Sequence, residues 1–416
     1  MRIVNLSTMD SSGGAARAAL RLHYGLRAIE VDSRVIVQHK TVDEDSIYGP
    51  QGMVANFAAK TRLLIDQLPV IPHWRHSSDV FAPGWLSGDA WRRTNALNPD
   101  IVHLHWITKA FLGIRDLPRL NAPIIWTLHD MWAFTGGCHY DTGCGRYQQA
   151  CGNCPVLGSG RDNDLAHRVQ TAKRRAWEGL DMTIVCPSRW LANCARSSAL
   201  LGRQRIEVIP NGIDLKQFHQ TEKATARKHL SITTNDRLIL FGAMDPTANA
   251  RKGFSYLQSA LQHLAASGLN KDTRVIVFGT PDHARPPIAD FIIQYISPLQ
   301  RDEDLAALFS AADVFVAPSL QDNLPNTVME ALACGTPCVA FNVGGMPDLI
   351  EHRASGYLAT PRDDKSLAKG IAWVLEDQSR WQQLSHHARS YTQEHFDLIT
   401  VAKQYRQLYS DILDHV

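Results

Sequence analysis

Short apolar runs recur along this chain and alternate with segments of helical spacing. Each run has about the length of a buried strand and is bounded by polar, glycine or proline residues. Strands that alternate with helices are typical of parallel sheets covered by helices. The sequence therefore predicts an α/β protein.

The apolar runs fall into two sets, separated by the turn-rich sequence Pro-Asn-Gly-Ile-Asp at residues 210–214. A chain of 416 residues is long enough for two domains of about 200 residues each. We therefore predict a domain boundary near residue 215. The predicted strands are 2–6, 33–37, 101–105, 124–128, 183–186 and 206–209 in the first set, and 237–242, 274–278, 291–295, 313–317 and 337–341 in the second.

The charge balance excludes one broad class of partner. Lysine and arginine number 43 and aspartate and glutamate 41, so the formal charge of +2 leaves little attraction for nucleic acid. The N-terminal residues lack the apolar core of a signal peptide, and no apolar run is long enough to span a membrane. We expect a cytoplasmic protein whose membrane contact, if it has any, is peripheral.

Residues 318–341 place two carboxylates around one strand-to-helix connection. Residues 313–317 predict a buried strand, and 327–333 predict the helix after a polar loop. Ligands of such sheets bind beyond the carboxyl ends of the strands, where a helix N-terminus offers backbone N–H groups to a phosphate. Asp322 lies in the loop, and Glu330, one turn into the helix, is placed to accept hydrogen bonds from a ribose.

A pair of adjacent cations, Arg251 and Lys252, follows the predicted strand 237–242 and precedes Gly253. When a sugar leaves a nucleoside diphosphate, negative charge grows on the departing diphosphate, and fixed cations stabilise that charge most in the transition state. These residue types suit that task. The alternative interpretation is a solvated helix start.

The segment from Asp322 to Pro337 resembles the donor-site signature of retaining GT-B glycosyltransferases of family 4, which reads Glu, seven residues, Glu, and then Ala-x-Ala-x-Gly-x-Pro. Asp322 stands where the family usually has its first glutamate, so this carboxylate is one methylene shorter. The family also has Gly-Arg at the first strand end of the second domain, where this chain has Gly242 and Ala243. We expect Arg251 to take the place of that arginine.

The resemblance implies a GT-B fold of two Rossmann-like domains that face each other across a cleft. Residues 1–215 would bind the acceptor, residues 216–390 would bind the nucleotide sugar, and residues 391–416 would form a helix that packs back on the first domain. The implied reaction is retaining, metal-independent transfer of a hexose from a nucleoside diphosphate sugar to a hydroxyl of a saccharide or polyprenyl-linked saccharide, in polysaccharide biosynthesis.

The resemblance also assigns the site residues. Glu330 is expected on the ribose, the loop backbone near the sugar and diphosphate, and the two cations on the phosphates. The candidate catalytic residues are His129, Arg251, Lys252 and Asp322, and the candidate donor-binding residues are Gly13, Gly14, Asn323, Leu324, Pro325, Asn326, Thr327 and Glu330.

Histidines lie at two predicted strand ends of the first domain. His129 is expected to bind a sugar hydroxyl, because similar enzymes have a His-Asp pair at this strand end. Asp130 would then orient the His129 ring through a hydrogen bond. His103 and His105 alternate on one strand and share a face, so we place both on the acceptor side.

Four of the eight cysteines cluster at Cys138, Cys144, Cys151 and Cys154. Four thiolates close together can bind a tetrahedral zinc ion, and the Cys-x-x-Cys spacing of the last two favours this. Free or reversibly paired thiols and an iron–sulfur cluster stay open as alternatives. A zinc here would be structural, and we expect no cofactor to be required for catalysis.

The sequence leaves other functions open. The patterns at 43–45 and 162–164 match the metal-binding Asp-x-Asp motif of another glycosyltransferase architecture, but neither follows a recognisable strand. A sugar-nucleotide epimerase of GT-B shape would use the same cleft without an acceptor. A non-catalytic subunit that binds sugar nucleotides would agree with the substituted Asp322 and the missing strand-end arginine.

Cations and apolar side chains mix in residues 60–75, and Trp85, Trp91, Arg92 and Arg93 follow. Such a surface can contact anionic lipid headgroups and hold a polyprenyl-linked acceptor. An ordinary amphipathic face is the alternative. We expect weak peripheral binding to membranes.

Overall fold

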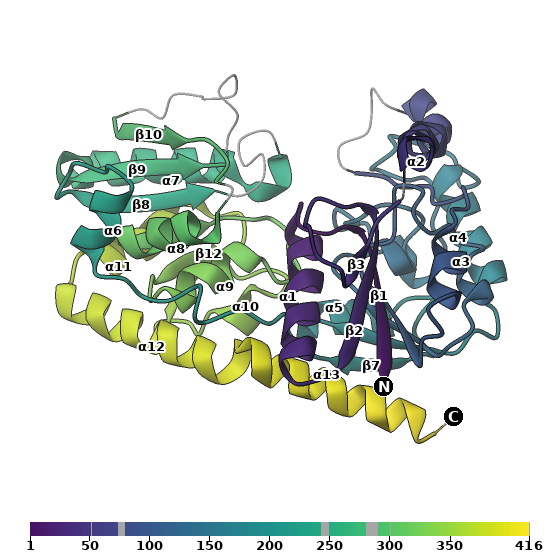
Figure 1. Ribbon diagram of the computed structural model, residues 1–416. Helices are drawn as coiled ribbons and strands as arrows, with labels where there is room; N and C mark the ends of the chain where they lie inside the picture. Colours follow the sequence, from purple (N-terminus) through teal and green to yellow (C-terminus); the bar gives the residue numbers. More distant parts are fainter. Residues whose placement is uncertain (51, 74–79, 243–248, 280–289, 300, 416) are drawn as a thin grey trace. The chain divides into compact units, whose positions relative to one another are not determined.

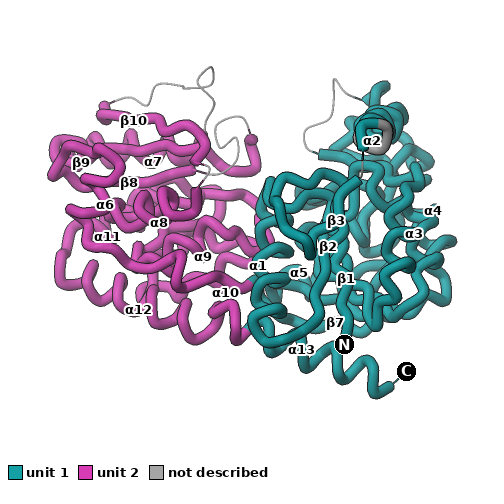
Figure 2. Tube along the Cα trace, viewed as in Figure 1, with its two compact units in different colours: residues 1–211, 401–416 teal, residues 212–400 magenta. Residues whose placement is uncertain are grey.

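The computed structural model describes residues 1–416 except residues 51, 74–79, 243–248, 280–289, 300 and 416. The chain forms two compact units, shown in different colours in Figure 2. Unit 1 comprises residues 1–211 and 401–416, and unit 2 comprises residues 212–400.

Unit 1 is built on a parallel sheet that has seven strands among the described residues, in the order β3-β2-β1-β4-β5-β6-β7. Strands β1, β2, β3 and β7 of this sheet are labelled in Figure 1. A parallel sheet is covered on both faces, so its strands carry continuous apolar side chains. In β1, Ile3, Val4 and Leu6 are fully buried. The predicted strands of the first set are confirmed. Strand β3 was not predicted, because two residues are too few to give a recognisable pattern. The strands are β1 Arg2–Met9, β2 Asp32–His39, β3 Ile47–Tyr48, β4 Ile101–Leu104, β5 Ile124–Thr127, β6 Met182–Cys186 and β7 Arg205–Val208.

Helices and short 3-10 turns connect these strands. Helix α4 shows how the local sequence sets a boundary, because the Asp164 side chain accepts a hydrogen bond from the backbone N–H of His167 and so caps its first turn. The helices and 3-10 turns before the crossing to unit 2 are α1 Gly14–Ala28, α2 Gly52–Gln67, η1 Leu68–His73, α3 Ala90–Asn95, η2 Leu117–Arg119, η3 Trp132–Phe134, η4 Arg146–Gln148, α4 Leu165–Ala176 and α5 Arg189–Arg196.

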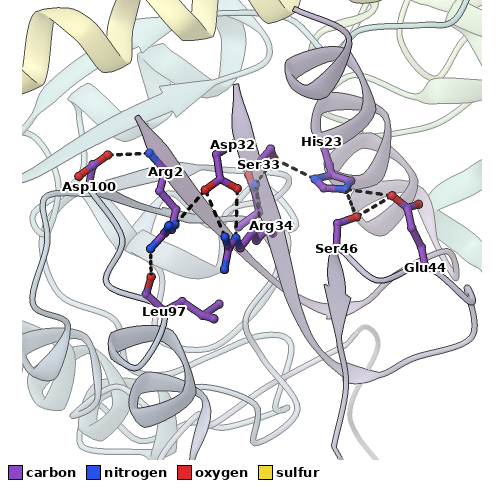
Figure 3. A network of polar contacts seen from close by, with 10 residues as sticks. Arg2, His23, Asp32, Ser33, Arg34, Glu44, Ser46, Leu97 and Asp100 are labelled. Carbon is purple, nitrogen blue, oxygen red and sulfur yellow. Dashed lines mark hydrogen bonds and ion pairs between the residues drawn. The ribbon is translucent and has the colours of Figure 1, made fainter. Parts of the chain in front are cut away.

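A polar network joins β1, β2 and α1 (Figure 3). Arg2 donates to Asp32 at 2.9 Å, which links the starts of the two strands. Deeper in the unit, the fully buried His23 of α1 bonds the hydroxyls of Ser33 at 2.8 Å and Ser46 at 3.0 Å. Burial lowers the pKa of His23 to about 4, so its ring is neutral and serves as a structural hydrogen-bonding group.

Unit 2 has a second parallel sheet, with six strands among its described residues in the order β10-β9-β8-β11-β12-β13. The predicted strands of the second set are confirmed, and β13 is again an addition. Its central strand β11 pairs with both β8 and β12. The strands are β8 Arg237–Gly242, β9 Thr273–Phe278, β10 Ile292–Ile296, β11 Val314–Ala317, β12 Cys338–Phe341 and β13 Gly356–Ala359.

The helices of unit 2 pack on this sheet and form two apolar clusters with it. One cluster contains Phe309 and Phe315, and the other contains Leu257 and Ile371. The predicted helix at 327–333 is confirmed as α9. The helical segments are α6 Lys223–His229, η5 Ala250–Lys252, α7 Phe254–Ala266, η6 Leu269–Asp272, α8 Asp302–Ala311, α9 Asn326–Ala333, α10 Met346–Leu349, α11 Asp364–Leu375 and α12 Gln378–Phe396.

The chain returns to unit 1 in its last helix, α13 Leu398–Leu413. The division between the units falls after residue 211, near the predicted boundary at 215. The predicted start of the returning segment at 391 is wrong, because the structure assigns residues up to 400 to unit 2. Tyr391 and Phe396 pack in a core of unit 2, whereas Tyr405 of α13 packs in a core of unit 1.

In the part of the chain that the structure describes, every helix is either too short or too polar to cross a bilayer.

Candidate functional site

The cations and the carboxylate predicted for the second domain meet in unit 2. Strands β8 and β11 are parallel neighbours, with Phe241 paired to Val316, so their carboxyl ends lie at the same edge of the sheet. The 3-10 turn η5, which contains Arg251 and Lys252, follows β8, and Asp322 follows β11. Sheet topology therefore brings together side chains that are 70 residues apart in the chain.

Asp322 is the centre of this cluster. Its Oδ2 accepts a hydrogen bond from Lys252 Nζ at 2.7 Å and lies 3.4 Å from Arg251 Nη1. Arg251 Nη1 also donates to the carbonyl of Gln321 at 2.8 Å. Burial alone would raise the pKa of Asp322, but Lys252 and Arg251 lower it to about 2. The carboxylate is therefore ionised at neutral pH and holds both cations in place.

Two glycines let the backbone pass close to this cluster. Gly253 has φ +72°, and a Cβ there would lie 1.9 Å from the carbonyl oxygen of Pro318. Gly344 has φ +57°, and a Cβ there would lie 1.9 Å from the carbonyl oxygen of Asp322. Because both obstacles are backbone atoms, any larger residue must displace the loop that holds Asp322.

Replacing Gly344 with alanine is expected to lower the free energy of unfolding by about 3 kcal/mol. The loss has two causes: an alanine is strained at positive φ, and its Cβ would collide with the carbonyl oxygen of Asp322. Urea unfolding of unit 2 measures the change. Gly268→Ala is the matched control, since Gly268 also has positive φ but a Cβ there meets nothing within 4 Å. If both variants lose the same free energy of unfolding, the close approach of residue 344 to the Asp322 carbonyl contributes nothing to the loss.

Helix α9 completes the site in unit 2. It begins at Asn326, after Pro325, and no side chain caps its N-terminus. Asn326 and Thr327 are partly exposed, whereas Leu324 is buried in the apolar core of the unit. Glu330 is buried one turn into the helix. The loop and helix thus offer a backbone edge with positive helix-dipole potential, next to two cations and a second carboxylate.

In unit 1, His105 and His129 lie at the ends of the adjacent strands β4 and β5. Nδ1 of His105 and Nε2 of His129 are 3.1 Å apart. Asn5 uses its amide nitrogen on Ser33 and Arg34, so its oxygen accepts from His105 Nε2 at 3.4 Å. His105 Nδ1 then accepts from His129 Nε2.

Burial lowers the pKa of His129 to about 4 and the pKa of His105 well below its ordinary value. Both rings are therefore neutral at physiological pH. A neutral imidazole exchanges hydrogen bonds with hydroxyl groups and adds no positive charge to a phosphate site. This chemistry agrees with the hydroxyl-binding role predicted for His129.

The prediction that Asp130 orients His129 is wrong, because its hydrogen bonds go elsewhere. Asp130 Oδ2 accepts from His139 Nδ1 at 2.6 Å and from Trp106 Nε1 at 2.9 Å, and Oδ1 accepts from the backbone N–H of Trp132 at 2.8 Å. His139 was missed by the sequence analysis, since nothing in its neighbourhood distinguishes it from a loop histidine. The aspartate thus braces the segment after β5.

His103 is also placed differently from its prediction. It is fully buried, its Nδ1 bonds Tyr409 Oη at 2.8 Å, and its Nε2 bonds Thr127 Oγ1 at 2.7 Å. Thr127 Oγ1 in turn bonds Tyr405 Oη at 2.9 Å. His103 therefore fastens α13 to the sheet of unit 1 and does not line an acceptor surface.

Gly13 and Gly14, two of the predicted donor-binding residues, follow the end of β1 in unit 1. Gly13 has φ +94° and precedes α1, whose first residue is Gly14. No side chain caps this helix. The two glycines share the sheet edge where β1 and its neighbour β4 end, whereas the other predicted donor-binding residues belong to unit 2.

Cys138, Cys144, Cys151 and Cys154, for which a structural zinc ion is predicted, all lie in unit 1. Among the described residues, which include all four cysteines, no three cysteine, histidine or acidic side chains are grouped so that they could hold a metal ion. Cys138, Cys151 and Cys154 pack in the apolar core of unit 1. Burial raises the pKa of all four thiols, and Cys144 is the partly exposed one among them. A zinc ion at these cysteines stays a prediction.

Comparison with known proteins agrees with this architecture. The model for Glycosyltransferase Family 4 matches residues 12–217, and the model for Glycosyl transferases group 1 matches residues 235–377. The D-inositol 3-phosphate glycosyltransferase of Thermobispora bispora is 26% identical over 337 residues, which cover 76% of this chain and 72% of that protein.

Two solved structures share the fold over their whole length. Sucrose-phosphate synthase from Thermosynechococcus elongatus has a TM-score of 0.72 at 19% identity, and Anabaena HepE in complex with UDP-glucose has a TM-score of 0.66 at 15% identity. Each alignment covers 100% of both chains. With two parallel α/β units and family matches in both, the chain belongs to glycosyltransferase family 4 and is a glycosyltransferase of the GT-B fold.

Proposed function

We propose that this enzyme transfers a hexose from a nucleoside diphosphate sugar to a hydroxyl of a saccharide or lipid-linked saccharide, with retention of anomeric configuration and without a catalytic metal ion. The observation that carries the proposal is the convergence of Arg251 and Lys252 on Asp322 at the carboxyl edge of the second sheet. Retention rests on the family resemblance.

The charges of this cluster suit a diphosphate. Two cations and one ionised carboxylate leave one net positive charge, held on side chains of which at most a fifth is exposed. In such a partly desolvated site, fixed cations stabilise a departing diphosphate without reorganising. Arg251 and Lys252 therefore carry out the neutralisation that a divalent ion performs in metal-dependent transferases.

The remaining roles follow from the parts of the site. The N-terminus of α9 and the loop at 323–327 bind the diphosphate and the sugar, and Glu330 accepts hydrogen bonds from the ribose hydroxyls. Gly13 and Gly14 are assigned to donor binding, because glycines let the backbone approach a ligand closely. The neutral ring of His129 binds a sugar hydroxyl, with the acceptor beside it. Anabaena HepE, which shares the fold, is known in complex with UDP-glucose, and this supports a sugar nucleotide as donor.

The test is turnover of a donor identified by thermal shift with a panel of nucleotides. A ligand at a hundred times its dissociation constant adds about 2.7 kcal/mol of stability. The purified enzyme, incubated with that sugar nucleotide and a saccharide panel, is expected to form a glycoside of unchanged anomeric configuration. Release of an altered free sugar without acceptor would identify an epimerase, and donor binding without any turnover would identify a non-catalytic subunit.

We also propose peripheral membrane contact through helix α2 and turn η1, in the setting of polysaccharide assembly on the cytoplasmic side of a membrane. Met53, Phe57 and Leu64 on α2 are 90%, 73% and 72% exposed, and Leu68 and Ile71 continue the exposed apolar surface. Residues 74 and 75 of the predicted lipid-binding segment lie outside the described residues.

Part of the predicted membrane surface is turned inward. Arg93 donates to the carbonyl of Tyr48 at 2.7 Å. Trp91 packs against the core of unit 1, with the guanidinium groups of Arg92 and Arg119 each 5.1 Å from its ring. The proposed contact therefore depends on the apolar side chains of α2 and η1.

Leu64→Glu is expected to weaken sedimentation with phosphatidylglycerol vesicles roughly tenfold, because inserting one leucine contributes about 1.5 kcal/mol and a carboxylate is repelled by the anionic surface. Ile292→Glu is the matched control, since Ile292 is 61% exposed but belongs to unit 2. If the two variants bind vesicles equally well, α2 is not the contact surface.

A further inference from the structure

A groove of about 600 Å³ lies along one side of α4 in unit 1. Helix α4 forms one wall, and the segment that leads into η2 forms the other. The lining residues are Arg115, Pro118, Asn163, His167, Arg168, Thr171, Ala172, Arg175 and Ala176.

One buried hydrogen bond joins the two walls, and two other hydrogen bonds anchor the wall that contains Arg115. Trp177, which follows α4, donates from its indole N–H to the carbonyl of Ile114 at 2.9 Å. The fully buried Asp116 accepts from the backbone N–H groups of Gly113 at 2.8 Å and Gly88 at 3.2 Å. Arg115 lies between these two fixed points, so its backbone is anchored opposite α4.

The groove carries three arginine side chains, which give it a positive charge. Arg115, Arg168 and Arg175 are exposed, and among the described residues none of them forms a salt bridge. The lining contains no aspartate or glutamate. By contrast, the neighbouring Arg119, outside the groove, pairs with Asp116 at 3.4 Å.

The geometry of α4 concentrates these charges on one surface. Arg168 and Arg175 are seven residues apart and so share a helix face, with Thr171 between them. Ala172 and Ala176 on the same wall have short side chains that leave the groove open. Arginine binds phosphate oxygens through paired N–H donors, and a hydroxyl and an amide, from Thr171 and Asn163, add neutral hydrogen bonds.

We propose that this groove is an anion-binding site for a ligand that carries a phosphate or diphosphate group. Its volume exceeds that of a single phosphate and suits a phosphorylated small molecule or a lipid headgroup. The groove belongs to unit 1, whereas Arg251 and Lys252 belong to unit 2. The groove would therefore bind a second anion in addition to the proposed donor. This inference does not depend on the donor proposal.

The experiment titrates inorganic pyrophosphate into the full chain by calorimetry, in a Lys252→Ala background that weakens binding at the unit 2 site. The groove variant is Arg168→Gln with Arg175→Gln. The matched control is Arg174→Gln with Arg203→Gln, which removes the same charge from exposed arginines outside the groove. We expect the groove variant to bind pyrophosphate at least tenfold more weakly, and the control to change less than twofold.

A second arm separates soluble from lipid-borne phosphate. The same variants are sedimented with phosphatidylglycerol vesicles and with phosphatidylcholine vesicles. Pyrophosphate binding lost only in the groove variant supports a site for soluble phosphate compounds. Vesicle binding that requires phosphatidylglycerol and is lost only in the groove variant supports a headgroup site.

The proposal is overturned if neither probe binds, or if the groove and control variants bind both probes equally. Circular dichroism and the thermal midpoint establish that the groove variant is folded. Stabilisation of the same variant by nucleotides, measured with Lys252 intact, is expected to match the wild type. A failure of the donor site is therefore distinguishable from a failure of the groove.

Discussion

Replacing Lys252 with alanine is expected to lower kcat by a factor of about 100 to 1000. Lys252 Nζ lies 2.7 Å from Asp322 and is placed to stabilise the charge that develops on the leaving diphosphate. Loss of a fixed donor of this kind removes about 3 to 4 kcal/mol of transition-state stabilisation. The measurement is the initial rate of glycoside formation at saturating sugar nucleotide.

The control for this prediction is Lys271→Ala, which removes an exposed lysine elsewhere in unit 2. This variant is expected to retain the wild-type rate. The Lys252→Ala variant should remain folded, because Arg251 still neutralises Asp322 at 3.4 Å. A Lys252→Ala enzyme that keeps more than a tenth of the wild-type kcat would contradict the assigned role.

Asp322→Asn is expected to lower the free energy of unfolding at pH 7 by about 2 kcal/mol. The neutral amide leaves Lys252 and Arg251 without their carboxylate, and the pKa of Asp322, which burial would raise, is instead held at about 2 by those cations. A carboxyl whose folded pKa lies below its unfolded value of 3.8 stabilises the protein above that unfolded value. Its contribution is lost as the pH falls through the folded pKa.

The stability difference between wild type and Asp322→Asn should therefore be constant above about pH 5 and shrink between pH 4 and pH 2. Urea unfolding followed across this range measures it. Glu394→Gln, which neutralises an exposed acid of α12 in the same unit, should show no such dependence. A variant as stable as the wild type at pH 7 would show that this ion pair adds nothing to stability.

Some parts of the candidate site have local sequence signals, whereas others depend on contacts between distant segments. Asp322, Glu330 and α9 could be placed because a strand, a loop and a short helix follow one another within about twenty residues, and each has a local signal. The partners of Asp322 could not be derived from spacing. They lie in η5, which follows β8, and β8 becomes the neighbour of β11 only through the strand order of the sheet.

The histidines show the same division. That His103 and His105 share a face follows from the alternation of a strand. Only the packing of α13 on that face makes His103 a partner of Tyr409, while His105 meets His129. Likewise, Asp130 could be assigned to the adjacent His129 from sequence, but the folded segment after β5 brings His139 to it.

The sequence by itself determined the α/β class, most strands of the two sheets and the region of the boundary between the units, because each depends on periodicity or turn signals within a short stretch. The tertiary structure decided which side chains meet, where the returning helix begins and which of the clustered cysteines are buried in the core. Those outcomes depend on strand order and on burial, which lowers the pKa of histidines and raises the pKa of thiols only after distant segments have packed around them.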